Sequence, residues 1–120
     1  LFSGDVIYKG RVPFLDSPET DTRHWLQGLD ELAQLDPQPG FVIPGHGDPS
    51  GDIASAMRAT REYIDYVRKV MASAVADFVS FEQAYAQADW SRYSAMPAFE
   101  ASNRGNAYRI YLELEAESLN

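Results

Sequence analysis

Cysteine is absent from this chain of 120 residues. Its absence excludes disulfide bonds, thiolate metal sites and cysteine nucleophiles, so any metal ion would need ligands from histidine, aspartate or glutamate. Histidine itself is scarce, with two residues. The chain also has no serine in an elbow motif, no phosphate-binding loop and no dinucleotide-binding glycine pattern. The common signatures of nucleophilic and nucleotide-dependent enzymes are therefore missing.

Basic residues are in the minority. Ten lysines and arginines stand against 18 acidic residues, which gives a formal net charge of −8 and a pI near 4.5. Nucleic acids and anionic membranes select basic surfaces, so we expect neither as a partner. No apolar run approaches the roughly 18 residues of a membrane span, and we expect a soluble chain.

The length and composition are those of one globular domain. A chain of this size buries roughly two-thirds of its unfolded surface, and 45% hydrophobic with 23% charged residues is close to the globular average. We expect a single or partial domain over 1–120, with candidate metal-ligand loops in 1–51 and a helical region over 52–120. Leu1 opens without an initiator methionine or a signal-peptide layout, which favours a piece of a longer polypeptide.

Strands and a helix are predicted for the first third of the chain. Residues 1–8 read as two short strand pieces around a Ser-Gly-Asp turn, and 41–43 as a short buried strand followed by a loop over 44–51. Between them, Asp21 or Thr22 can cap an amphipathic helix that ends before Pro37. This order of strand, helix and strand favours an α/β arrangement with parallel strands.

The rest of the chain is predicted to be mostly helical. Apolar residues keep a three- and four-residue spacing from Asp52 to Phe78, which predicts one long amphipathic helix. A capping-box pattern at 80–83 opens a short helix through Ala88. We expect irregular structure over 89–103 and a final helix over 106–119.

Two stretches combine a metal-binding side chain with permissive glycines. They are SGD, which ends in Asp5, and PGHGD, which contains His46. Both follow a predicted strand, where ligands bind in α/β sheets, and Gly4, Gly45 and Gly47 allow close approach. A carboxylate with an imidazole suits zinc, iron or manganese. The other interpretation is that Asp5 caps a turn and His46 is an ordinary loop residue.

Other polar residues are weaker candidates. Asp48 either accepts a hydrogen bond from His46, fixing its tautomer, or starts a turn before proline. His24 lies inside the predicted helix that begins near Thr22, where a solvated side chain is expected. The acidic residues Asp16, Glu19 and Asp21 lack the calcium-loop spacing and are expected to be solvated.

The order LFSGD, a GR-x-P loop, a helix and then VIPGHGDP resembles the C-terminal half of the metallo-β-lactamase-fold hydrolases. This resemblance implies an α/β (α+β) fold class, namely part of an αββα sandwich with short strands and three or four helices. It also implies that Asp5 bridges two metal ions and that His46 ligates the second. Both residues are thereby assigned catalytic and metal-binding roles.

Within that family, GRVPFLD and NRGNAYRIYLELE resemble the SoxH-like and quinoprotein-relay metallohydrolases. The resemblance implies two divalent ions, with zinc favoured over iron or manganese, and a small-molecule substrate. An activated hydroxide would attack an ester, thioester, lactam or related bond. Arg11, Val12 and Phe14 would border the substrate cleft. The resemblance is compatible with a periplasmic location.

Most of the family's metal ligands have no counterpart in this sequence. The H-x-H-x-D-H motif and a further histidine would lie before Leu1, so the 120 residues alone are expected to bind metal weakly and to be inactive. The alternative hypothesis is a non-catalytic interaction or packing module that binds no metal. Such a module would expose a sheet face and self-associate as a homo-oligomer.

Overall fold

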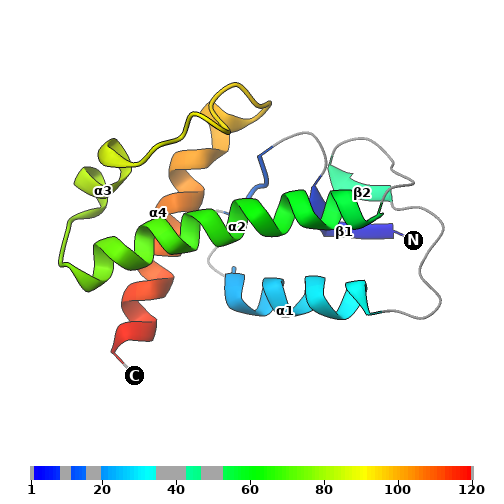
Figure 1. Ribbon diagram of the computed structural model, residues 1–120, viewed down its shortest axis with the longest axis horizontal. Coiled ribbons are helices and arrows are strands. Elements are labelled where there is room, and N and C mark those ends of the chain that lie inside the picture. Colours follow the sequence, from blue (N-terminus) through cyan, green and yellow to red (C-terminus); the bar gives the residue numbers. More distant parts are fainter. Residues whose placement is uncertain (1, 9–11, 16–19, 35–42, 47–52, 120) are drawn as a thin grey trace. The chain divides into compact units, whose positions relative to one another are not determined.

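The computed structural model describes residues 2–8, 12–15, 20–34, 43–46 and 53–119, with the backbone alone at 2–8, 32–33, 43–46 and 53–56. Among these residues, two strands and four helices follow one another in the order β1, α1, β2, α2, α3 and α4 (Figure 1). The chain divides into two compact units. Unit 1 holds residues 1–11 and 21–64, and unit 2 holds residues 12–20 and 65–120.

The strands of unit 1 form a two-stranded parallel sheet. β1 spans Phe2–Tyr8 and β2 spans Ile43–His46, side by side in Figure 1. The parallel direction agrees with the prediction from the strand, helix and strand order. The boundaries differ, because β1 is one strand rather than two pieces around a turn. β2 includes Pro44–His46, which were expected in a loop.

Helix α1 spans Thr22–Ala33, and its predicted start is confirmed. The Asp21 carboxylate accepts a hydrogen bond from the His24 N–H at 3.1 Å, and the Asp21 carbonyl accepts one from the Trp25 N–H at 3.0 Å. The Asp21 side chain thereby satisfies an N–H group that has no backbone partner within the helix, and the Asp21 carbonyl accepts the first i→i−4 bond of the helix. Leu29 packs inward at 2% exposure.

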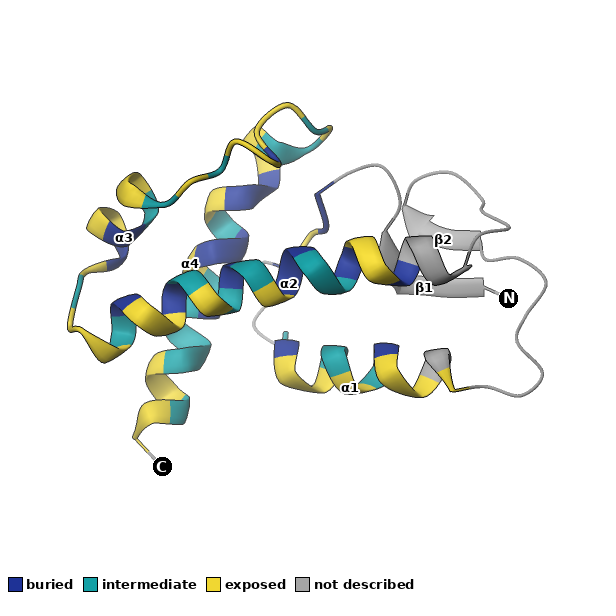
Figure 2. Cartoon of the chain, viewed as in Figure 1, coloured by how far each residue is buried: buried dark blue, intermediate teal, exposed yellow. Residues whose placement is uncertain are grey.

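Helix α2 spans Ile53–Ala76 and contributes residues to both units. Figure 2 shows its buried positions recurring along the helix, as the predicted amphipathic pattern requires. In unit 1, Arg61 of α2 reaches α1, where it donates to the Leu26 carbonyl at 3.2 Å and forms an ion pair with Asp30. Among the α2 side chains that the structure describes, the buried ones are Met57, Thr60, Tyr63, Ile64, Val67, Met71 and Ala74.

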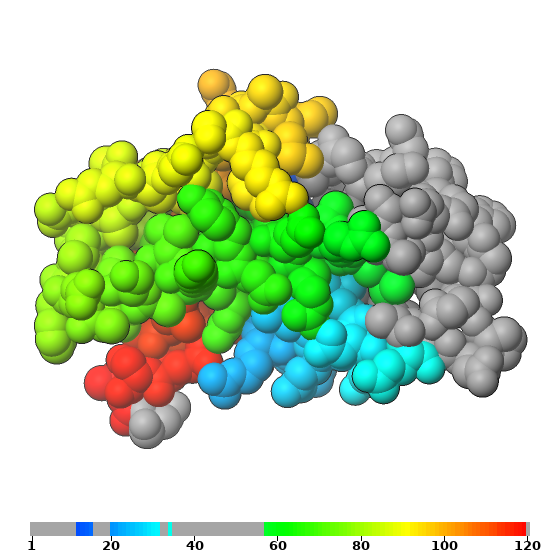
Figure 3. Space-filling view, in the orientation of Figure 1, coloured from blue at the N-terminus to red at the C-terminus, as the bar shows by residue number. Residues whose placement is uncertain are grey.

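Helix α3 spans Phe81–Gln87, close to the prediction. The Ser80 hydroxyl accepts a hydrogen bond from the Gln83 N–H at 3.3 Å, so Ser80 caps the helix. Phe81 and Ala84 are its buried residues. The residues that follow, drawn in yellow, lie against α2 in Figure 3. Ring contacts of Tyr66 with Trp90 and Tyr93 join the same segments.

Helix α4 spans Phe99–Ser118, so the predicted start at 106 is wrong. Ala98, with a φ of 69°, precedes the helix and makes no side-chain capping bond. The first turns bury polar residues rather than apolar ones, namely Ser102, Asn103 and Asn106. The beginning of this helix therefore lacks the apolar periodicity and the capping residue from which a helix is predicted.

The predicted fold class is wrong. Of the residues whose side chains the structure describes, 71% are helical and none lies in a strand. β1 and β2 form a sheet of two strands, whereas an αββα sandwich needs two packed sheets between its helical layers. The apolar residues of α1 and α2 recur at helical spacing, and helices form most of the described chain. The protein therefore has a helical fold rather than an α/β sandwich.

Candidate functional site

The two residues predicted to bind metal lie on neighbouring strands of unit 1. Asp5 lies within β1 and His46 is the last residue of β2. In the parallel pairing Gly4 stands opposite Pro44 and Tyr8 stands opposite His46, with register irregularities between these pairs. The backbone of both residues is described, whereas their side chains lie outside the described part. The sheet therefore brings SGD and PGH together as adjacent segments.

The glycines and neighbours of this candidate site are only partly described. Gly45 precedes His46 in β2. Gly47, Asp48 and Arg11, which were predicted to shape or border the site, lie outside the described residues.

Two further residues, predicted to border a substrate cleft, belong to unit 2. Val12 is fully buried, and Phe14 has 49% of its surface exposed. Val12 therefore presents no side chain to solvent, whereas Phe14 does.

The residues rejected as metal ligands behave as expected where they are described. His24 is exposed on α1, and Asp21 serves as the cap of that helix. Asp16 and Glu19 lie outside the described residues. Within the described part, no group of three or more histidines, aspartates and glutamates is placed to hold a metal ion. Catalytic zinc has three protein ligands, so Asp5 and His46 would need at least one more.

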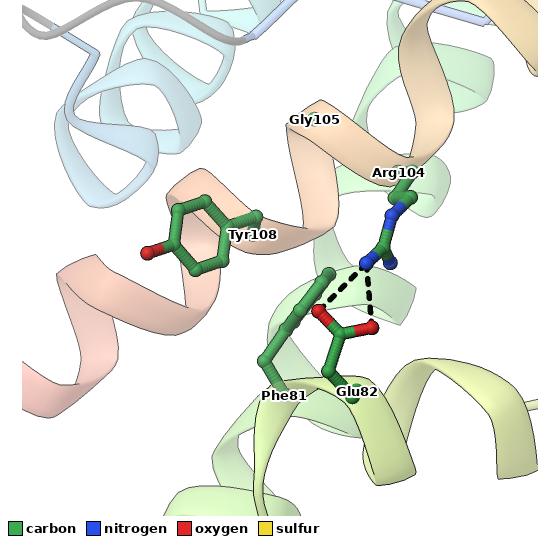
Figure 4. A pocket seen from close by; sticks show the side chains of 5 residues that line it. All are labelled: Phe81, Glu82, Arg104, Gly105 and Tyr108. Atoms are coloured by element: carbon green, nitrogen blue, oxygen red, sulfur yellow. Dashed lines mark hydrogen bonds and ion pairs between the residues drawn. The ribbon is translucent and has the colours of Figure 1, made fainter.

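A second candidate site lies in unit 2 and was missed by the sequence analysis. It is a cavity of about 390 Å³ lined by Phe81 and Glu82 of α3 and by Arg104, Gly105 and Tyr108 of α4 (Figure 4). Arg104 Nη2 donates to both oxygens of Glu82, at 2.7 and 2.6 Å. The spacing of Arg104, Gly105 and Tyr108 puts them on one helical face. Phe81 and Glu82 complete the lining of the cavity, because α3 packs against α4.

Comparisons with protein families, characterised proteins and solved structures find no match to this chain. The resemblance to metallo-β-lactamase-fold hydrolases therefore depends on the motifs alone. Among the described residues, no helix has the length and apolar character needed to cross a membrane.

Proposed function

We propose that this chain supplies Asp5 and His46 as ligands to a metal-dependent hydrolase. The observation that carries the proposal is the parallel pairing of β1 with β2, in which Gly4 stands opposite Pro44 and Tyr8 opposite His46. Two glycine-flanked segments with a carboxylate and an imidazole thus occupy neighbouring strands. This donor set suits zinc, iron or manganese.

When bound, two divalent ions would lower the pKa of a water molecule to about 7 and polarise the bond to be cleaved. The Asp5 carboxylate and the His46 imidazole would be among the groups that hold these ions. The proposal requires further ligands, because two side chains are fewer than the three of catalytic zinc. In the family that the sequence resembles, those ligands come from motifs that these 120 residues do not contain. The substrate class is an ester, a thioester, a lactam or a related small molecule.

Metal content tests the proposal directly. Elemental analysis compares the full polypeptide that carries this sequence with its Asp5→Asn, His46→Gln and His24→Gln variants. We expect about two ions per native chain, and a loss of metal in the first two variants, because each removes a ligand. His24→Gln is the matched control, since His24 is exposed on α1, and it should keep the native metal content.

Hydrolysis provides the second measurement. On a panel of ester, thioester and lactam substrates, His46→Gln should lower the rate by a factor on the order of 100 or more, because outright loss of a ligand exceeds the roughly 10–100-fold cost of losing a ligand's supporting partner. Native metal content in both Asp5→Asn and His46→Gln would overturn the assignment. A metal-free native polypeptide would do the same, and light scattering would then test the alternative of a self-associating interaction module.

A further inference from the structure

The cavity between α3 and α4 combines an ion pair with aromatic walls. Its volume of about 390 Å³ lies in the range of about 300–1,000 Å³ found for small-molecule sites. Figure 4 shows the Glu82 and Arg104 side chains in direct contact, with the ring of Phe81 beside Glu82 and that of Tyr108 further along α4. Every lining residue belongs to unit 2, so the cavity is independent of the proposed metal site.

The Arg104 guanidinium is held in place by aromatic rings. Its central carbon lies 5.1 Å from the ring centroid of Phe81 and 5.4 Å from that of Tyr85. Cation–π contacts of this kind orient the planar group without using its N–H donors. The N–H donors of Arg104 therefore stay available for hydrogen bonds while its guanidinium packs on the two rings.

The ion pair between that guanidinium and Glu82 is largely exposed. The Glu82 side chain is 75% exposed and that of Arg104 is 51% exposed, and exposed ion pairs contribute little stability. Both carboxylate oxygens share one nitrogen, Nη2. In the bidentate geometry that arginine favours with carboxylates, two different nitrogens would each donate to one oxygen. A ligand carboxylate could therefore make the better contact.

The apolar side of the cavity suits a planar ring. The Phe81 and Tyr108 rings meet at 5.1 Å between centroids with an interplanar angle of 66°. Phe81 is 7% exposed, whereas Tyr108 is 46% exposed and retains ring surface for another contact. Gly105 has no side chain to occupy the space between Arg104 and Tyr108. Aromatic ligands gain from edge-to-face or offset contacts with such rings.

We propose that this cavity binds a small aromatic carboxylate, a molecule with one planar ring and one carboxylate. The ligand carboxylate takes the place of Glu82 on the Arg104 guanidinium, and the ring packs against Tyr108 beside Gly105. Glu82 thus acts as an internal competitor that occupies the guanidinium when no ligand is bound.

Titration with benzoate, followed by NMR chemical shifts of the full chain, tests the proposal, with benzamide as the neutral analogue. Glu82→Gln should strengthen benzoate binding about two- to fivefold, since it removes a competing exposed ion pair. Arg104→Gln should weaken it about tenfold or more, because a charge-assisted hydrogen bond is lost. Benzamide should bind more weakly than benzoate.

The matched control is Arg92→Gln. Arg92 also lies over a tyrosine ring, 5.5 Å from the centroid of Tyr93, but it does not line the cavity. This variant should bind benzoate as the native chain does. Equal binding of benzoate and benzamide, or unchanged or weaker binding in Glu82→Gln, would overturn the proposal. The Glu82 result decides even where Arg104→Gln fails to fold, because Glu82 is largely exposed.

Discussion

The side chain of Asn106 joins α4 to the backbone of segment 12–15 through two hydrogen bonds. Its Oδ1 accepts from the Leu15 N–H and its Nδ2 donates to the Pro13 carbonyl, each at 2.6 Å. Asn106 is fully buried, and so is Leu15. The two bonds satisfy backbone groups that are far from Asn106 in sequence, so this one side chain fixes a long-range contact within unit 2.

Asn106→Leu should destabilise the protein by about 2–4 kcal/mol, because two buried backbone groups lose their partners. Asn106→Asp separates the two hydrogen bonds, since it keeps an acceptor for the Leu15 N–H and loses the donor to the Pro13 carbonyl. Chemical denaturation measures both variants. Ala101→Gln, at an exposed position of the same helix, is the control and should stay within about 0.5 kcal/mol of native. Native stability in Asn106→Leu would contradict the assigned role.

Phe78 closes α2 in a left-handed conformation. Its φ is 57°, its N–H donates to the Val75 carbonyl at 3.2 Å, and the Val79 N–H donates to the Ala74 carbonyl at 2.8 Å. This bond pattern usually has glycine in the left-handed position. Phe78 is also 95% exposed, so its ring compensates little for the backbone strain.

Phe78→Gly should therefore stabilise the protein by about 0.5–1 kcal/mol, the relief of left-handed strain less the entropy that glycine loses on folding. Thermal and chemical unfolding provide the measurement. Phe78→Ala is the matched control, because it removes the ring but keeps a Cβ at the same φ, and it should show no such gain. Equal stabilisation by both variants would attribute the effect to the ring rather than to φ.

Tyr111 links α4 to the segment before α3, since its hydroxyl donates to the Val79 carbonyl at 2.7 Å. Burial raises the pKa of Tyr111 above its ordinary value of 10.0, and the nearby Glu115 carboxylate raises it further. In the unfolded chain the phenol loses its proton at the ordinary value. The folded state keeps the proton to higher pH, so the contribution of Tyr111 to stability declines as pH rises above 10.

We expect Tyr111→Phe to flatten the loss of stability as the pH rises above the ordinary phenol pKa of 10.0, because the titrating group is gone. At neutral pH the same variant should cost about 0.5–1.5 kcal/mol through the lost hydrogen bond. Urea unfolding at several pH values separates the constant loss of stability, due to the hydrogen bond, from the dependence of stability on pH. Glu115→Gln should flatten the decline less, and an unchanged slope in Tyr111→Phe would rule out this linkage.

Local signals in the sequence predicted three of the helices well. α1 combines apolar spacing with a capping residue, α2 has the apolar spacing, and α3 has the capping pattern. These interactions involve neighbours along the chain, such as Asp21 with His24 and Ser80 with Gln83. The start of α4 was not predicted, because its buried polar residues bond to residues far away in the sequence. Asn103 is buried and donates to the Tyr85 hydroxyl at 3.1 Å, and Asn106 bonds to segment 12–15. Buried polar residues of this kind obtain their partners only in the folded chain.

The wrong fold class has a different origin. The strand, helix and strand order of the first third of the chain favoured an α/β class, and the motif resemblance extended that expectation to an αββα sandwich. The sequence contains the two strands that carry Asp5 and His46, and the structure pairs them in parallel. Helices account for most of the remaining described chain. Short motifs identify candidate ligands, but they do not determine how many strands surround them.

By itself the sequence determined the helical periodicity and the caps of α1 and α3, and Asp5 and His46 stay a prediction from its motifs. Tertiary structure decided the register that sets β1 beside β2, the burial of Asn106, and the meeting of Glu82 with Arg104. Periodicity and capping depend on residues within about four positions of each other. Strand register, buried polar pairs and cavity walls depend on residues far apart in sequence, so only the folded chain brings them together.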